Sequence, residues 1–513
     1  SQISMPLPKS RQNLTELFLS QLASEISPTV SLTLTPSKAF ARQYKYDPIA
    51  FSHDCFKWGT DSGPTEYQDE IMAALVTHRR VSVRGPHGLG KSALASWLVL
   101  WFALTRDADE IDWKTPTTAS AWRQLTKYLW PEVSKWSRKL DWEKVGRPIF
   151  TPKVEQLTLS LKLGYGEAFA AASDIPEMME GAHADSLFYV FDESKVVPDA
   201  TFDAAEGAFS GAGKNTKIEA YALAISTPGE PIGRFYDIHA RKPGFEDWWV
   251  RHVTVDECIK AGRISPEWVE QRHKQWGDGP IYMNRVLGEF AESDQMGIIP
   301  LVWVEMANER YRDWQESGAG PGDFSLLSVD VARYGADRTT MAFRYGDLIS
   351  ELRYSSKEDT MTTASKVAGI LTGLGGEAVI DVMGVGAGVV DRLREQKYDI
   401  FAFNASEKTD QRDRSGELGF VNCRAAAWWH LREILDPANG EAIALPPDDS
   451  LIGDLVTCRL KEHTSGKILI ESKEEIRGRI GRSTDAADAV VMAFAVDSRP
   501  VLPFSWIIIP QVV

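Results

Sequence analysis

The sequence predicts an α/β protein made of two successive domains, and three observations predict it. A glycine-rich loop at residues 85–92 lies between a short apolar-alternating run and a long apolar helix. A second apolar run at residues 186–191 ends in two acids. Beyond a Gly- and Pro-rich stretch at residues 317–322, further strand patterns carry isolated acidic residues. We therefore predict a domain boundary at that stretch, with one sheet before it and a second sheet after it.

The composition is that of a globular protein. A chain of 513 residues suggests about two to four domains on the usual length prior. With 43% hydrophobic and 25% charged residues, it can bury sizeable cores. The formal net charge of −15 argues against adhesion of the whole surface to nucleic acid or to an anionic membrane, and it leaves room for local basic grooves.

The cysteines and the apolar runs indicate the cellular compartment in which we expect the protein. Cys55, Cys258, Cys423 and Cys458 form no C-x-x-C pair, so neither a zinc knuckle nor a disulfide framework is indicated. A reducing cytosol fits this pattern. The start of the chain has no signal-peptide pattern, and no apolar run reaches the length of a membrane span. We expect no membrane partner.

The N-terminal region says little about function. Residues 1–60 carry scattered Pro and Ser and one helical stretch at residues 14–26. They predict an arm or a packed helical segment. The next helix begins near Gln68, whose amide offers a donor and an acceptor together and can read adenine. A solvated residue at a helix start is an equally good interpretation of Gln68.

The glycine-rich loop has the pattern Gly-x-x-x-x-Gly-Lys-Ser, with a strand predicted before it and a helix after it. That order is the context of a phosphate-binding P-loop. Gly85, Gly88 and Gly90 let backbone N–H groups converge on phosphate oxygens. Lys91 can reach the β- and γ-phosphates, and the Ser92 hydroxyl can bind Mg²⁺. The pattern predicts an ATP–Mg²⁺ site, and a glycine-rich turn without a ligand is the alternative.

The second apolar run predicts a buried parallel strand with Asp192 and Glu193 at its carboxyl end. Ligands bind at that edge in open α/β sheets. Asp192 would hold Mg²⁺, and Glu193 would polarise the attacking water. A strand that simply ends in a polar turn is the alternative.

A third apolar strand ends in Ser226 and Thr227. Their hydroxyls lie near the same predicted sheet edge and can sense the γ-phosphate. A capped turn before Gly229 explains them equally well.

Strands and helices after the linker follow the order β-β-β-α-β-α, with a late acid-bearing helix, and this order is that of an RNase H-like fold. The first strand carries Asp330, the next two meet across the turn at residues 346–347, and a later strand carries Asp381. The last helix begins with Asp485 and Asp488. The predicted domains are an N-terminal arm or helical segment at 1–60, a P-loop ATPase domain at 61–255, a lid or linker subdomain at 256–320, an RNase H-like nuclease domain at 321–498 and a C-terminal tail at 499–513.

The four acids of this half predict a metal site. An acid inside an apolar strand is costly unless it is paired or bound to metal, and both Asp330 and Asp381 have such positions. Asp485 and Asp488 are three residues apart and share one helix face. With adjacent strands and this helix packed across them, the carboxylates converge on two Mg²⁺ or Mn²⁺ ions for phosphodiester hydrolysis. A helix N-cap for Asp485 and a hydrogen-bonded buried acid for Asp381 are the alternatives.

Three arginines precede the last helix. Arg477, Arg479 and Arg482, with glycines between them, suit contacts with DNA phosphates near the metals. A solvated charged hairpin is the alternative.

Together, these motifs resemble the large terminase subunit of tailed bacteriophages over roughly residues 60–498. The motifs that carry the resemblance lie at residues 85–92, 187–193, 226–228, 285–290, 329–332 with 335–337, 381–388 and 483–489. The resemblance implies a RecA/ASCE-like ATPase sheet followed by the nuclease. It implies that ATP hydrolysis drives double-stranded DNA through a portal into a procapsid, and that the nuclease cuts concatemeric genomes.

The resemblance also implies roles and partners. Lys91 and Ser92 match the phosphate and Mg²⁺ ligands, and Asp192 and Glu193 match the metal-side acid and the catalytic base. Ser226 and Thr227 match a coupling motif, and Asp330, Asp381 and one or both of Asp485 and Asp488 match the nuclease ligands. The implied partners are the portal protein, a small terminase subunit and other copies of the chain in a pentameric ring on the portal, with a monomer expected in isolation. The implied location is the cytoplasm of the infected bacterium, without retention in the mature virion.

One departure concerns the arginine that terminase P-loops often carry within the loop. Residues 86–89 here are Pro, His, Gly and Leu. The charge-neutralising arginine is therefore open between Arg84 in cis and an arginine from a neighbouring subunit, such as Arg123 or Arg234. Two other functions stay open: an ATP-driven DNA helicase or translocase without an active nuclease, and a non-catalytic capsid or portal adaptor.

Overall fold

The computed structural model describes residues 34–60, 63–180, 182–212, 217–292, 296–332, 338–461, 463 and 466–498. The helix expected at residues 14–26, the motif at 335–337 and the tail at 499–513 lie outside these ranges. The chain forms two compact units. The first comprises residues up to Ser82, Lys91–Ile225 and Glu246–Val250, and the second comprises Val83–Gly90, Ser226–Phe245 and the chain from Arg251.

A seven-stranded sheet has the order β3-β4-β2-β5-β6-β1-β7. Strands β4, β2, β5 and β6 pair in parallel, and β3 is antiparallel to β4. The glycine-rich loop follows β1 and the two acids end β5, with β6 between them, which is the predicted RecA/ASCE-like order. The strands are β1 Arg80–Arg84, β2 Trp113–Ala119, β3 Ser160–Lys162, β4 Gly166–Ala170, β5 Ser186–Asp192, β6 Glu219–Ser226 and β7 Trp249–His252.

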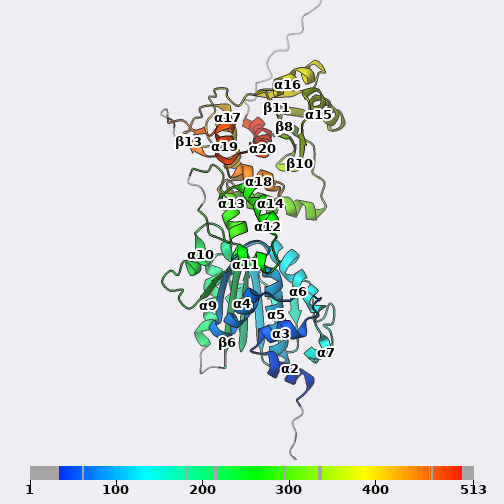
Figure 1. Cartoon of the computed structure of the whole chain (residues 1–513), viewed down its shortest axis with the longest axis vertical. Coiled ribbons are helices and arrows are strands. Elements are labelled where there is room, and N and C mark those ends of the chain that lie inside the picture. Colours follow the sequence, from blue (N-terminus) through cyan, green and yellow to red (C-terminus); the bar gives the residue numbers. More distant parts are fainter. Residues whose placement is uncertain are drawn as a thin grey trace, which may run out of the picture. The chain divides into compact units, whose positions relative to one another are not determined.

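Helix α5 (Lys91–Ala108) is the central helix of the first unit (Figure 1). Every side chain from Leu94 to Arg106 is buried, because the helix is apolar on all sides and packs against β2, β5 and α6. Strand β2 is central although its sequence is polar. The other helical segments of this unit are α2 Pro36–Tyr44, α3 Pro48–Cys55, α4 Glu66–His78, η1 Gln124–Leu129, α6 Trp130–Ser137, α7 Trp142–Val145, α8 Glu177–Glu180, η2 Ser194–Val196 and α9 Asp199–Gly211.

The second unit contains a five-stranded sheet with the order β10-β9-β8-β11-β12. Its first three strands pair antiparallel, and β8, β11 and β12 pair in parallel. This is the RNase H-like arrangement that the sequence predicts. The strands are β8 Leu326–Asp330, β9 Arg338–Tyr345, β10 Leu348–Ser356, β11 Glu377–Asp381 and β12 Ile400–Phe403.

Helices cover both faces of this sheet (Figure 1). Helices α15 (Thr360–Leu374) and α16 (Gly386–Glu395) pack on one face, with Leu327, Val329 and Ile380 in their core. Helices α17 (Cys423–Leu435) and α20 (Asp485–Ala495) pack on the other, with Leu326 and Val379. Because side chains alternate along a strand, Asp330 and Asp381 lie on the α20 face.

In the sequence, the remaining elements of the second unit precede and follow the strands of this sheet. Residues 473–480 form helix α19, not a hairpin, because Ser472 and Glu475 form a capping box at its start. None of the helices in the described parts of the chain could span a membrane. The elements are α10 Gly233–His239, α11 Val255–Lys260, α12 Pro266–Trp276, α13 Pro280–Tyr282, η3 Met283–Leu287, α14 Leu301–Ser317, η4 Pro437–Asn439, α18 Asp449–Leu455, β13 Leu460–Lys461, β14 Leu469–Ile470, α19 Lys473–Ile480 and η5 Val496–Ser498.

Candidate active sites

The first unit brings three of the predicted ATPase residues together. The Lys91 ammonium at the start of α5 lies 3.4 Å from a carboxylate oxygen of Glu193. The Glu193 backbone N–H donates to the Asp192 carboxylate at 3.0 Å. Both acids therefore lie at the carboxyl end of β5, beside the lysine, as the motif order predicts. Ser92 is the second residue of the same helix.

Burial and backbone conformation distinguish the two acids. Asp192 is 2% exposed, and burial and the neighbouring Glu193 charge raise its pKa to about 7, against the opposing effect of Lys91. Glu193 has φ 44° and ψ 48°, in the left-handed region that non-glycine residues rarely adopt. Such conformations cluster at functional sites, where the surrounding structure must hold them. A bound Mg²⁺ would favour ionised Asp192, so the donor suits that ion.

The glycine-rich loop itself belongs to the second unit, where residues 285–289 hold it. The His87 N–H donates to the Arg285 carbonyl at 2.8 Å. Gly88 and Gly90 have φ 95° and 90°, so both positions require glycine. A Cβ on Gly288 would come within 2.7 Å of the Gly85 Cα, so the loop and this segment touch backbone to backbone.

The candidate arginines differ in their surroundings. Arg84 pairs with Glu289 and donates to the Gly288 carbonyl at 2.7 Å. Arg123 is half-buried, and the Arg234 guanidinium lies over the Phe245 ring. A catalytic role for any of them stays a prediction.

Three further predicted nucleotide contacts, Gln68, Ser226 and Thr227, are buried. Gln68 is completely buried, so it is not a solvated helix-start residue. Its carbonyl accepts from the Thr65 N–H at 2.9 Å, and its Nε2 has no hydrogen-bond partner among the described residues. Ser226 ends β6 and donates to the Thr227 carbonyl at 2.7 Å. Their roles toward a nucleotide stay predictions.

In the second unit, the two strand acids lie side by side. Val329 pairs with Ile380 across the parallel strands β8 and β11, which sets Asp330 next to Asp381 at the carboxyl edge. Helix α20 packs against both strands. The adjacency on which the predicted convergence depended is present.

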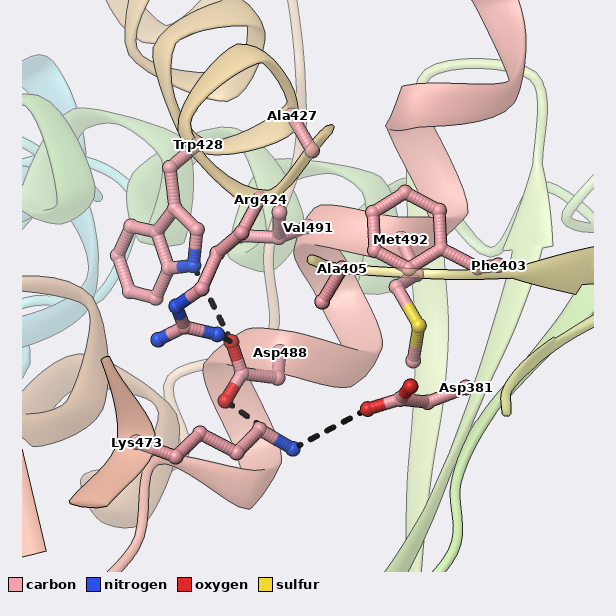
Figure 2. Close-up of a pocket in the computed structure, with 10 residues that line it drawn as sticks. All are labelled: Asp381, Phe403, Ala405, Arg424, Ala427, Trp428, Lys473, Asp488, Val491 and Met492. Atoms are coloured by element: carbon pink, nitrogen blue, oxygen red, sulfur yellow. Dashed lines mark hydrogen bonds and ion pairs between the residues drawn. The ribbon is translucent and has the colours of Figure 1, made fainter. Parts of the chain in front are cut away.

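A lysine ammonium lies where these carboxylates converge. The Lys473 Nζ, from the first residue of α19, lies 2.8 Å from both oxygens of Asp330. It lies 3.4 Å from Asp488 and 3.7 Å from Asp381. Figure 2 shows this ammonium between the acid of α20 and the acid of β11. Three acids from three elements thus share one cation.

Asp488 has additional donors from α17 and from its own helix. Arg424 forms an ion pair with it, and the Trp428 Nε1–H donates to the same oxygen at 3.1 Å. The Thr484 hydroxyl donates to the other oxygen at 2.8 Å. Asp485 instead accepts from the Arg338 N–H at 3.2 Å and from the Ser483 hydroxyl.

These contacts give the acids different titration behaviour. Burial raises the pKa of Asp330 to about 7, and burial also raises the pKa of Asp381. Burial alone would raise the pKa of Asp488 too, but Arg424 and Lys473 lower it. Burial would lower the pKa of Lys473, but Asp330, Asp488 and Asp381 raise it.

Residues of this cluster line a small pocket (Figure 2). Its charged residues are Asp381, Asp488, Lys473 and Arg424. The other lining residues are Phe403, Ala405, Ala427, Trp428, Val491 and Met492.

The donor set suits a hard cation, since carboxylates are the preferred ligands of Mg²⁺ and Mn²⁺. A positive charge already lies among the carboxylates in the form of Lys473. Within the described ranges, no group of three or more His, Cys, Asp or Glu side chains has the arrangement of a ready metal site.

The three arginines expected at DNA have different surroundings. Arg477 is exposed on α19. Arg479 donates to Glu471 at 2.6 and 3.0 Å, and Arg482 pairs with Asp454 and donates to the Gln275 carbonyl at 2.9 Å. The guanidinium groups of Arg479 and Arg482 are thus engaged within the protein. Their contact with DNA stays a prediction.

Comparison with known proteins finds similarity to one curated phage protein. No protein-family model matches the chain. Over 294 residues, the chain is 27% identical to the probable terminase large subunit of Enterobacteria phage P7. The chain is thus similar, over about half its length, to one phage terminase large subunit. The match covers 52% of this chain and 53% of the P7 protein, so the chain spans about half the length of the curated relative it matches.

Solved terminase structures are more distant. The nuclease domain of the large terminase subunit gp2 of bacterial virus Sf6 is 21% identical, covering 39% of this chain and 98% of that chain at a TM-score of 0.34. The large terminase of a thermophilic bacteriophage is 12% identical, covering 84% of this chain and 100% of that chain at a TM-score of 0.39. The thermophilic phage protein was also solved with ADP, and a mutant Sf6 domain with manganese. The fold assignment of this chain rests on its own strand orders, not on these likenesses.

The sequence patterns did not assign a role to Lys473 or Arg424. One signal points to Lys473. A helix N-terminus disfavours a cation, yet this lysine is the first residue of α19, directly after its Ser472 cap. Arg424 has no comparable local signal, because its partner Asp488 is 64 residues away.

Proposed function

We propose that this chain is the ATP-driven motor and nuclease of a phage DNA-packaging machine. The observation that carries the proposal is the convergence of Asp330, Asp381 and Asp488 on one cationic group. The pairing of Lys91 with Glu193 after a P-loop supports nucleotide hydrolysis, and the similarity to the P7 protein supports the packaging role.

In the proposed ATPase, Lys91 binds the β- and γ-phosphates and Glu193 orients and deprotonates the attacking water. Ser92 and Asp192 would hold Mg²⁺, which when bound neutralises charge that develops on the phosphates. In this structure, Lys91 lies against Glu193. Redirecting its ammonium to the phosphates would free the Glu193 carboxylate to act as a base.

In the proposed nuclease, Asp330 and Asp381, with Asp488 or Asp485, would hold two Mg²⁺ or Mn²⁺ ions. Such ions, when bound, activate water and stabilise the leaving oxygen of a phosphodiester. Lys473 would have to leave the carboxylates, and its ammonium would then be free for a DNA phosphate. Arg477 is exposed on the same helix as Lys473, and we propose that it contacts the DNA backbone.

The proposed partners are double-stranded DNA, the portal of the procapsid and a small terminase subunit. The proposed assembly is a pentameric ring on the portal in the cytoplasm of the infected bacterium, with a monomer in isolation. ATP turnover measured with and without portal tests the coupling, and turnover that never responds to portal would favour a separate translocase.

Two substitutions test the two activities separately. Lys91→Ala is expected to abolish ATP turnover and to leave metal-dependent DNA cutting intact. Asp381→Ala is expected to abolish cutting and to leave ATP turnover intact. Wild-type protein that never cuts DNA with Mg²⁺ or Mn²⁺ would support the alternative, a helicase or translocase without an active nuclease.

A further inference from the structure

Helix α20, which carries Asp485 and Asp488, begins without a side-chain cap of its own. The first N–H groups of a helix need acceptors, and a Thr at the N-cap position usually supplies one. Here Thr484 occupies that position, but its hydroxyl donates to Asp488 instead. The helix start therefore depends on an acceptor from elsewhere in the second unit.

Asp454 of α18 supplies that acceptor. Its side chain is 2% exposed, and one carboxylate oxygen accepts from the Ala486 N–H at 3.1 Å. A carboxylate at this end also interacts favourably with the helix dipole. The contact lies between Asp485 and Asp488, so it acts on the turn that carries both acids.

The other oxygen of Asp454 pairs with Arg482. Arg482 also donates through Nε to the Gln275 carbonyl at 2.9 Å, in the last turn of α12. An arginine suits such an unpaired carbonyl at a helix C-terminus. The ion pair thus joins the end of α12 to the start of α20.

The space around this junction is tight. A Cβ on Gly453 would come within 3.0 Å of the Trp276 ring and 3.1 Å of the Arg482 guanidinium. Arg272 pairs with Asp449 at 2.6 Å, which fixes α12 to α18 independently of Arg482. The close packing at Gly453 therefore places α18 where Asp454 can contact α20, and the Arg272–Asp449 pair is a separate link that does not reach α20.

We propose that Asp454 and Arg482 are positioning residues for the nuclease, and that they set the first turn of α20 so that its acids face Asp330 and Asp381. The inference rests on the proposed nuclease function, because it takes the acids to be metal ligands. It assigns Arg482 to the junction and not to a DNA phosphate. Removing an outer partner of a metal ligand typically weakens metal affinity by about 10–100-fold.

The test uses the full chain and Mn²⁺ as the probe. Asp454→Asn and Arg482→Gln each break the ion pair, and Asp449→Asn is the matched control, since it breaks the α12–α18 pair without touching α20. Two readouts are taken against Mn²⁺ concentration: the rise in Tm without DNA, and the rate of plasmid cutting. We expect both junction variants to need at least about tenfold more Mn²⁺ in both readouts. The maximal cutting rate should change less than the Mn²⁺ requirement, ATP turnover should be unchanged, and the control should match the wild type.

Several results would overturn the inference. One is a Mn²⁺ requirement of the junction variants that equals that of the wild type. A second is an equal shift of the Mn²⁺ requirement in Asp449→Asn, which would show only general destabilisation. Another is a loss of about one unit from the salt slope of DNA binding in Arg482→Gln, which would assign Arg482 to a phosphate. A wild type that binds Mn²⁺ but never cuts overturns the proposed nuclease alone, and the Tm titration still decides the junction. A wild type without any Mn²⁺ response overturns both.

Discussion

Lys473 donates from its ammonium to both carboxylate oxygens of Asp330 at 2.8 Å, across 143 positions of the sequence. Asp330 is 4% exposed, and its strand neighbour Asp381 is 6% exposed. Carboxylates this deeply buried need a cation or a proton. The lysine provides the cation here, so the proposed metal ions and the lysine compete for the same oxygens.

That competition predicts the effect of removing the lysine. Lys473→Met should lower the Tm of metal-free protein, because it leaves buried carboxylates without their cation. It should also increase the stabilisation by Mn²⁺, because the ion no longer displaces an ammonium. Differential scanning fluorimetry with and without Mn²⁺ measures both effects. Lys461→Met is the control, since Lys461 pairs with Glu475 near the surface. An unchanged Mn²⁺ effect in Lys473→Met would contradict the competition.

Glu193 offers a second prediction, for the ATPase. Glu193→Gln keeps the size of the side chain and removes the proposed base, so ATP turnover should fall by about 10²–10⁴-fold. Nucleotide binding should persist, since Lys91 is then released from its ion pair. Phosphate release and binding of a fluorescent nucleotide measure the two effects. Glu132→Gln is a control on the same unit, where Glu132 pairs only locally with Lys135. Full turnover in Glu193→Gln would assign the base elsewhere.

The ion pair of Arg84 with Glu289 leads to a third prediction. If Arg84 has a structural role in the second unit, Arg84→Ala and Glu289→Ala should each lower the free energy of unfolding. The two losses should not add in the double variant, because both single changes remove the same ion pair. The double-mutant cycle should then give a coupling of about 0.5–3 kcal/mol in the free energy of unfolding. Chemical denaturation of the four proteins measures it. Additive effects, with ATP turnover lost only in Arg84→Ala, would instead favour Arg84 as the charge-neutralising arginine.

His239 predicts a specific pH dependence of stability. Burial, together with the charges of Arg84 and His252, lowers the pKa of His239 to about 3. An unfolded histidine titrates near pH 6.5, so between about pH 6.5 and pH 3 only the unfolded state gains the proton. The stabilising contribution is therefore complete above about pH 6.5 and is lost as the pH falls through that window.

His239→Phe keeps a ring beside Phe235 and Phe290 and removes this titration. The variant should lose less stability than the wild type on acidification, by up to about 1.4 kcal/mol for each pH unit within the window. Denaturation at about pH 7.5 and about pH 5 measures the difference. Equal losses in both proteins would show that His239 does not titrate in this way.

Much of the fold follows from local patterns, for physical reasons. Short apolar runs identify the strands of Asp192, Asp330 and Asp381, because an acid at the end of a buried strand is visible in the sequence itself. The glycine pattern identifies the loop before Lys91, because few residues allow its backbone conformation. The β-hairpin and the late acid-bearing helix predict the order of the second sheet. The capping box of Ser472 and Glu475 is a local pattern too, and it makes the hairpin interpretation of residues 473–480 wrong.

Only the tertiary structure shows which side chains from distant parts of the sequence contact one another between these elements. Periodicity shows which face of a strand is buried, but not which distant side chain meets it. Lys473 among the acids, Arg424 against Asp488 and Asp454 at the start of α20 are such contacts. Each joins residues that are at least 32 positions apart in the chain, and each depends on helix packing, to which a local pattern has no access.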